Sequence, residues 1–220
     1  MGISLAFDGP VAVVTWDDGD NRVNLDSLGR FNEIFDELDE VTGPLAVVIT
    51  GTGKYFSNGL DLDRFANNLD ELGATVEGMQ RLFARILRFP AFVVAAINGH
   101  AFAGGAMLAC TGDYRVMRAD RGYWCINELE IGLPLSNAMA ALIVGRLPRP
   151  SARAAMLTAR RFDGASALAG GIVDEVAAEG EVVARSIEVA ASIATKSREV
   201  LAVHKGQLMG SVADQFDPRG

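Results

Sequence analysis

Short, continuous runs of apolar residues recur along the first half of the chain, and each is bounded by glycine, proline or aspartate. Three of them, Val11 to Trp16, Leu45 to Thr50 and Phe92 to Ile97, have the length and β-branched content of strands buried on both faces. Between them, apolar residues return at helical spacing, from Asp26 to Val41, with Asn24 or Asp26 as the cap, and from Val76 to Leu87. Strands that alternate with helices predict an α/β fold.

After two more short predicted strands, Tyr114 to Met117 and Tyr123 to Ile126, the chain becomes mostly helical. The helices are predicted from capping serines or amphipathic spacing, and they run from Ser136 to Leu147, from Ser151 onward, from Glu181 to Ile193 and from Lys196 to Met209. A polar tail follows the last of them. Pro148 and Pro150 mark the change from alternating strands and helices to helices alone, so we predict an α/β core in residues 1–147 and a helical region in residues 148–220.

The excess of acidic over basic residues excludes some classes of binding partner. The chain has 220 residues, of which 20 are lysine or arginine and 28 are aspartate or glutamate, so its formal net charge is −8. Such an acidic surface repels phosphate backbones, and we therefore expect no nucleic-acid partner. A small anionic ligand remains compatible, because a local basic cluster or a helix N-terminus can bind it against the global charge.

The two cysteines, Cys110 and Cys125, lie in apolar runs, which favours buried reduced thiols over a disulfide. With two histidines and no close cysteine–histidine spacing, the sequence has no metal-binding pattern. The N-terminus lacks a basic start before an apolar stretch, so we expect no signal peptide. The longest uncharged stretch, Phe89 to Gly112, contains a proline and several glycines, which argues against a membrane span. We expect a cytoplasmic protein.

Two glycine-rich turns follow buried strands, from Gly51 to Leu62 and from Asn98 to Ala109. In the second, Gly104 and Gly105 precede a run of good helix formers. A glycine pair that opens a helix exposes free backbone N–H groups, which suit an oxygen that carries negative charge, although close packing of helix on strand is an alternative explanation. Neither turn fits a phosphate loop of the Walker type, because Lys54 is not followed by serine or threonine.

A serine nucleophile is disfavoured. Ser57, His100 and Asp113 supply the residue types of a catalytic triad, but the position after the glycine pair is Ala106, and the spacing provides no triad geometry. A turn histidine that bonds to nearby backbone is the favoured interpretation of His100.

Two acids stand among apolar neighbours. Glu128 and Glu130 lie in the segment from Tyr123 to Ser136, at what we predict to be the end of a strand, where both would point to one side and Leu129 to the other. A carboxyl group in an apolar wall has a raised pKa and can transfer protons near neutral pH. A solvated strand end is the alternative, and the sequence leaves open which of the two acids is buried.

Three segments together resemble a known family. They are FSNGLDL (56–62), NGHAFAGGAMLACTGDYRVM (98–117) and ELEIGLP (128–134). In this order and spacing they resemble the crotonase superfamily, the enoyl-CoA hydratase/isomerase family, and the likeness spans nearly the whole chain. The resemblance implies a crotonase-like spiral of ββα turns with a C-terminal helical trimerisation region, assembled as a homotrimer or a dimer of trimers.

The resemblance also implies an acyl-CoA thioester substrate, whose carbonyl oxygen would accept hydrogen bonds from the backbone N–H groups of Leu60 and Gly104. Coenzyme A would be part of the substrate, so no separate cofactor is implied. Substrate contacts are implied for residues of the two glycine-rich turns: Lys54, Ser57, Gly59, Asp61, Ala103, Gly105 and Met107. Lys54 and Arg64 are candidate cations for the CoA phosphates, and Arg22 is a more distant one.

The acids decide which reaction is implied. Hydratases of this family use two glutamates, and the first position aligns here with Met107, which cannot activate water. The second aligns with Glu128. One glutamate in an apolar pocket suffices to move a proton between two carbons, so the resemblance implies a Δ3,Δ2-enoyl-CoA isomerase. An enoyl-CoA hydratase of low activity and a non-catalytic acyl-CoA-binding protein are the alternatives.

Overall fold

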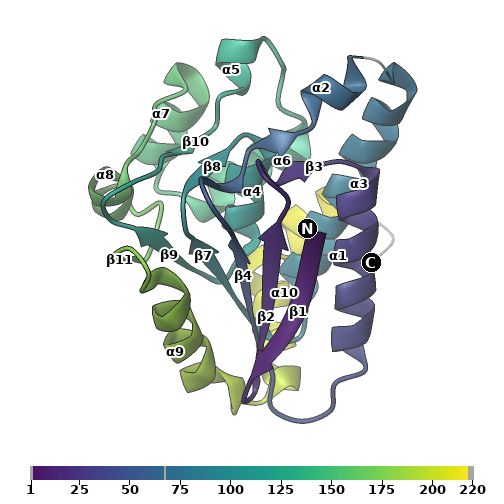
Figure 1. Ribbon diagram of the computed structural model, residues 1–220, viewed down its shortest axis with the longest axis vertical. Coiled ribbons are helices and arrows are strands. Elements are labelled where there is room, and N and C mark those ends of the chain that lie inside the picture. Colours follow the sequence, from purple (N-terminus) through teal and green to yellow (C-terminus); the bar gives the residue numbers. More distant parts are fainter. Residues whose placement is uncertain (1, 67, 218–220) are drawn as a thin grey trace.

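The computed structural model of the protein describes residues 2–66 and 68–217, and a six-stranded sheet runs through it (Figure 1). In spatial order its strands are β1 (Gly2–Asp8), β2 (Val11–Asp17), β4 (Ala46–Gly51), β7 (Phe92–Ile97), β9 (Tyr114–Arg118) and β11 (Glu175–Ala177). The β1–β2 pair is antiparallel and the other pairs are parallel. The predicted strands in residues 11–16, 45–50, 92–97 and 114–117 are thereby confirmed.

Helices cover both faces of this sheet, which explains why its strands are continuous apolar runs. Val48, Val94 and Val116 face α9 (Val182–Ala194) on one side, together with other small buried residues. Alternate residues of the same strands, such as Val47, face the larger core on the other side. Strands enclosed in this way must be apolar on both faces.

Short strands follow the long ones and form two small sheets. One contains β5 (Tyr55–Ser57), β8 (His100–Phe102) and β10 (Trp124–Cys125), and the other contains β3 (Arg22–Val23) and β6 (Gly59–Leu60). A long strand, a short strand and a helix therefore recur along the chain, with α1 (Leu25–Asp39), α2 (Leu62–Phe65), α3 (Leu69–Arg88) and α4 (Gly104–Thr111) as the helices. This recurring layout confirms the predicted α/β spiral.

Helix ends follow local chemistry in most places. Asn24 caps α1 through a capping box with Ser27, and Ser136 caps α6 (Asn137–Arg146) by accepting the N–H of Met139. The prediction that Ser151 caps the next helix is wrong. That helix, α7 (Arg149–Thr158), begins two residues earlier, because the first turn of a helix tolerates proline, which has no N–H to donate.

Two other predictions are corrected. Glu128 and Glu130 do not end a strand, because they belong to α5 (Glu128–Ile131), a single helical turn. The predicted start of a polar tail after Met209 is also wrong, since α10 (Arg198–Phe216) includes residues 211–216 of it, and residues 218–220 lie outside the described residues. The reason is burial: Val212, Ala213 and Phe216 face the core, and α10 packs along α3 and α6.

The region after residue 148 is tied closely to the sheet. It adds β11 beside β9, covers one sheet face with α9, and includes α8 (Gly164–Ala169). The division between 1–147 and 148–220 stays a prediction. No helix in the described ranges is long and apolar enough to cross a membrane.

Candidate active site

A cavity of about 290 Å³ lies where the glycine-rich turns after β4 and β7 meet α5. Its apolar wall is formed by Met79, Met107, Ile131, Leu133, Pro134 and Met139. Polar groups line the rest, among them Glu128, Asn127 and Arg22. Figure 1 places α2 and α5 at the same end of the molecule, beyond the strands. Such a position, past the carboxyl ends of parallel strands, is where open α/β sheets bind ligands.

The two turns are in backbone contact, and glycine is what permits it. Gly59 has a φ of +74°, and a Cβ added there would lie 3.0 Å from the Phe102 carbonyl oxygen and 3.1 Å from the Gly104 nitrogen. A Cβ on Gly105 would come within 2.3 Å of the Ser57 carbonyl oxygen. This contact holds the backbone after Gly59 against the start of α4.

The backbone N–H groups of Leu60 and Gly104 belong to this junction, and both residues line the cavity. Gly104 is the first residue of α4, so its N–H has no acceptor within the helix. Asp61 donates its N–H to the Val23 carbonyl at 3.0 Å. Because successive N–H groups of an extended chain point in opposite directions, the Leu60 N–H points away from β3. Both N–H groups are therefore left without a partner in the helix or the strand pairing, and their role as donors to one oxygen atom stays a prediction.

Ala103, which precedes Gly104 and also lines the cavity, has an unusual backbone. Its φ of 49° and ψ of −122° lie in a region that L-residues rarely adopt. Such strain costs about 1–3 kcal/mol and occurs mostly where a site requires it. Here it turns the chain so that α4 starts at the cavity.

Glu128 is the buried acid of the two that the sequence singled out. Its side chain is 8% exposed, and among the described residues its Oε2 atom has no hydrogen-bond partner. Burial raises the pKa of this carboxyl group to about 7. Glu130 lies two residues further on the same helical turn and therefore points away, where it is exposed and pairs with Arg161 at 3.4 Å. The expectation that both acids point to one side is wrong.

Three other predicted substrate contacts, Ser57, Asp61 and Gly105, shape the site without lining the cavity. Ser57 is fully buried, donates to the Asn21 carbonyl at 2.7 Å and accepts the Gly59 N–H at 3.2 Å. Asp61 caps α2 and accepts a hydrogen bond from the Asn24 amide at 3.2 Å. Gly105 makes the close approach to Ser57 described above.

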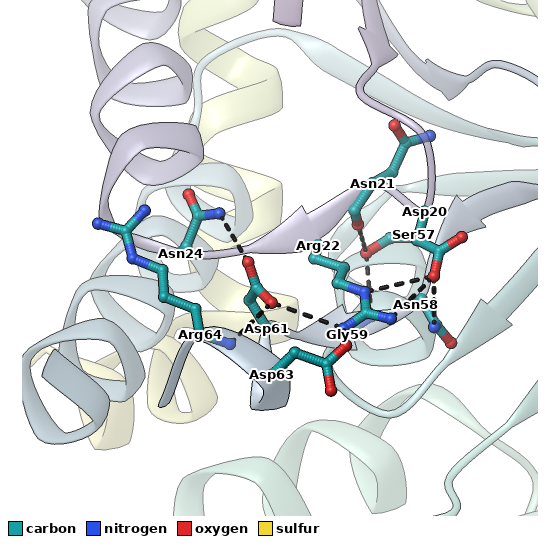
Figure 2. Close-up of polar contacts among 10 residues, drawn as sticks. All are labelled: Asp20, Asn21, Arg22, Asn24, Ser57, Asn58, Gly59, Asp61, Asp63 and Arg64. Carbon is teal, nitrogen blue, oxygen red and sulfur yellow. Dashed lines mark hydrogen bonds and ion pairs between the residues drawn. The ribbon is translucent and has the colours of Figure 1, made fainter. Parts of the chain in front are cut away.

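Two of the three candidate cations for the CoA phosphates, Arg22 and Arg64, are engaged with carboxylates, and Figure 2 shows this for Arg22. Arg22 is not distant, because it lines the cavity, where it pairs with Asp20 at 3.0 Å and Asp63 at 2.5 Å. Arg64 pairs with Asp26 at 2.6 Å and with Glu71 on α3. Lys54 lies outside the cavity lining, with its ammonium group 5.0 Å above the ring centre of Tyr55. A role for Lys54 in phosphate binding stays a prediction.

The triad residues do not meet. Ser57 bonds to Asn21, whereas the His100 ring stacks on Phe102 at 5.1 Å and accepts the Tyr123 N–H. The carboxylate of Asp113 instead binds the buried ammonium group of Lys205. These separate partners agree with the interpretation of His100 as a structural residue of a turn.

The cysteines are free and buried, as predicted. Within residues 2–66 and 68–217, no three histidine, cysteine or acidic side chains are grouped so that they could hold a metal ion. Sequence reasoning missed Met79, Met139 and Asn127, which line the cavity. The two methionines lie on helices outside the motifs, and only their place in a helical apolar stripe could have suggested that they are buried.

Comparison with known proteins identifies the family. Residues 7–218 match the sequence profile of the family described as enoyl-CoA hydratase/isomerase. The chain is 32% identical over 189 residues to enoyl-CoA delta isomerase 2, peroxisomal, of Arabidopsis thaliana, which covers 81% of this chain and 79% of that protein. It is 33% identical over 210 residues to a putative enoyl-CoA hydratase of Thermus thermophilus, covering 91% of this chain and 81% of the relative.

A solved structure agrees with these relatives. The apo structure of an enoyl-CoA isomerase from Mycobacterium tuberculosis superposes on this one with a TM-score of 0.90 at 30% identity, and the match covers 98% of this chain and 94% of the other. Sequence and fold together lead to one conclusion. The chain belongs to the enoyl-CoA hydratase/isomerase family.

Proposed function

We propose that the protein is a Δ3,Δ2-enoyl-CoA isomerase. One observation carries the proposal: among the described residues that line the cavity, Glu128 is the one buried carboxyl group, and its pKa is raised. Met107, which is 1% exposed, occupies the cavity wall at the position that aligns with the first of the two glutamates of the family's hydratases. The likeness to delta isomerases supports the same choice.

In the proposed reaction, the Glu128 carboxylate removes a proton from C2 of a 3-enoyl thioester. The electron pair of that C–H bond forms a dienolate, whose oxygen accepts hydrogen bonds from the N–H groups of Leu60 and Gly104. Each such donor contributes about 3–4 kcal/mol to lowering the barrier. Glu128 then returns the proton to C4, and the double bond lies between C2 and C3. Coenzyme A is part of the substrate, so the reaction needs no separate cofactor.

The direct test is incubation of the purified protein with a trans-3-enoyl-CoA while the 2-enoyl product is followed. Hydration of crotonyl-CoA as fast as isomerisation would contradict the proposal and favour the hydratase alternative. Thermal stabilisation by acyl-CoA without product from any enoyl-CoA would indicate a binding protein instead. We also propose a trimer or a dimer of trimers, which sedimentation or light scattering would measure.

The pH dependence of the reaction follows from the pKa of Glu128. The base must be deprotonated, so kcat/KM should rise about tenfold per pH unit below pH 7 and level off above it. An unperturbed glutamate would place this midpoint near 4.3. The measurement is kcat/KM against pH for a 3-enoyl-CoA, and a profile that is flat from about pH 5 upward would show that the base titrates like an ordinary glutamate, which would contradict the raised pKa of Glu128.

Restoring the missing acid should change the reaction. In Met107→Glu, a carboxylate would line the same cavity as Glu128 and lie in the first turn of α4, where the helix dipole favours negative charge. We expect detectable hydration of a 2-enoyl-CoA and slower isomerisation, at a stability cost of about 1–3 kcal/mol.

The matched control is Met139→Glu, which places the same acid in the cavity from a different helix, α6. It should give no 3-hydroxyacyl product. If folded Met107→Glu binds acyl-CoA but forms no hydrated product, then more than this one position separates the two activities.

A further inference from the structure

Met79 lies between two cavities. It lines the active-site cavity and also a second void of about 10 Å³ deeper in the core. The side chain is 1% exposed, and its sulfur is 2.9 Å from the point where a Cβ on Gly104 would lie. Met79 therefore packs directly against the residue that we propose as an oxyanion donor, and it separates the two spaces.

The void behind Met79 is lined mainly by buried apolar side chains. Phe31, Leu82, Phe83 and Leu108 form much of its wall, and each is at most 3% exposed. Its volume is about that of one water molecule, but a water needs two or more polar partners to stay in such a space. Trp16 and Ser27 also line the void, but the Ser27 hydroxyl already donates to the Asn24 carbonyl, and the Trp16 indole N–H, which has no partner among the described residues, would give a water a single bond. An apolar group therefore fits these surroundings better than water does.

A methionine side chain can move readily between the two spaces that it separates. Its side chain is unbranched and has three rotatable bonds, so it adapts to irregular spaces more readily than leucine or phenylalanine. An acyl chain whose carbonyl lies at Gly104 passes beside Met79, and a longer chain can continue inward only if this side chain moves. The other route for the chain is outward, past Ile131 and Leu133, which are 44% and 40% exposed at the cavity.

We infer that the void behind Met79 is a subsite for the far end of the acyl chain, and that Met79 sets the chain length that the enzyme prefers. The inference rests on the proposed function, because it takes an acyl-CoA as the ligand. The inward route is favoured because it buries each added methylene among apolar side chains, whereas the outward route leaves methylenes in contact with water.

The test compares kcat/KM over a series of trans-3-enoyl-CoA substrates from short to long chains. Met79→Ala joins the two spaces and frees room for about three methylene groups. Since each buried methylene is worth about fourfold, the ratio of long-chain to short-chain kcat/KM should rise about 50-fold. Met79→Phe should lower long-chain kcat/KM at least about tenfold and leave the shortest substrate nearly unaffected.

Met117→Ala is the matched control, because Met117 is a fully buried methionine on β9 that lines neither cavity. It should lower stability without changing the chain-length profile. If Met79→Ala does not fold, Met79→Val supplies a smaller enlargement with the same direction of change. Equal changes for all chain lengths in the Met79 variants, or no change, would overturn the inference and favour the outward route.

Binding of saturated acyl-CoAs separates this inference from the proposed function. Affinity measured by calorimetry should follow chain length in the wild type and shift in Met79→Ala in the same way as kcat/KM. A protein that binds saturated acyl-CoAs with this dependence on chain length, but isomerises no enoyl-CoA, would support the subsite and contradict the proposed isomerase function. Isomerase activity whose chain-length profile is unchanged in Met79→Ala would support the isomerase function and contradict the subsite.

Discussion

Glu128→Gln should abolish isomerisation and leave acyl-CoA affinity nearly intact. The substitution keeps the shape of the side chain but removes the group that carries the proton, so kcat should fall by roughly 10²–10⁴-fold or more. The assay is turnover of a 3-enoyl-CoA, with affinity measured separately by calorimetry. Glu130→Gln is the matched control, since that acid is exposed and pairs with Arg161 outside the cavity. If Glu130→Gln is the inactive variant, the assignment of the base is wrong.

The same substitution should make the protein more stable above neutral pH. The folded-state pKa of Glu128 is about 7, above the ordinary value of 4.5, so the folded protein binds this proton more tightly than the unfolded chain does. Its stability therefore falls as the pH rises from 4.5 to about 7, by about 3 kcal/mol in total. Glu128→Gln removes this loss. Urea unfolding should show the gain at pH 8 and almost none near pH 4.

Lys205→Met should destabilise the protein by about 3–5 kcal/mol, the second large effect that we expect. Lys205 is 5% exposed, and its ammonium group bonds to the Asp113 carboxylate at 2.7 Å and to the Ala91 carbonyl at 3.2 Å. These bonds attach α10 to the start of β7 and to the segment that follows α4. Removing the lysine leaves the Asp113 charge largely buried without its cation.

Lys196→Met, at an exposed position between α9 and α10, is the control and should change the free energy of unfolding by less than about 0.5 kcal/mol. Adding Asp113→Asn to Lys205→Met should recover part of the loss, because the unpaired charge is then gone. Urea unfolding of the wild type, Lys205→Met, Asp113→Asn and the double variant measures the coupling. Additive losses in the double variant would mean that the pair is not the source of the effect.

Much of the fold is determined by local patterns in the sequence. Strands enclosed on both faces must be continuously apolar, so the three runs between Val11 and Ile97 identify the sheet. Short-range capping bonds place the starts of α1 and α6, which is why Ser136 could be recognised without a structure and Asn24 was one of two candidate caps. The glycine-rich motifs likewise identify where the cavity lies, because glycine is required where two backbones touch.

Tertiary structure alone decided which groups face the cavity. Glu128 and Glu130 have similar neighbours in sequence, and only the helical turn of α5 buries one and exposes the other. Arg22 looked remote because dozens of residues separate it from Asp61 and Asp63, yet the pairing of β3 with β6 brings it to the cavity. Met79 gave no signal, since an apolar residue on a helical stripe has the same pattern whether its neighbour is core or cavity. The periodicity of a sequence shows which face of a helix or strand is buried. A site depends on which residues of other segments lie opposite that face, and their positions are set only when distant segments pack together.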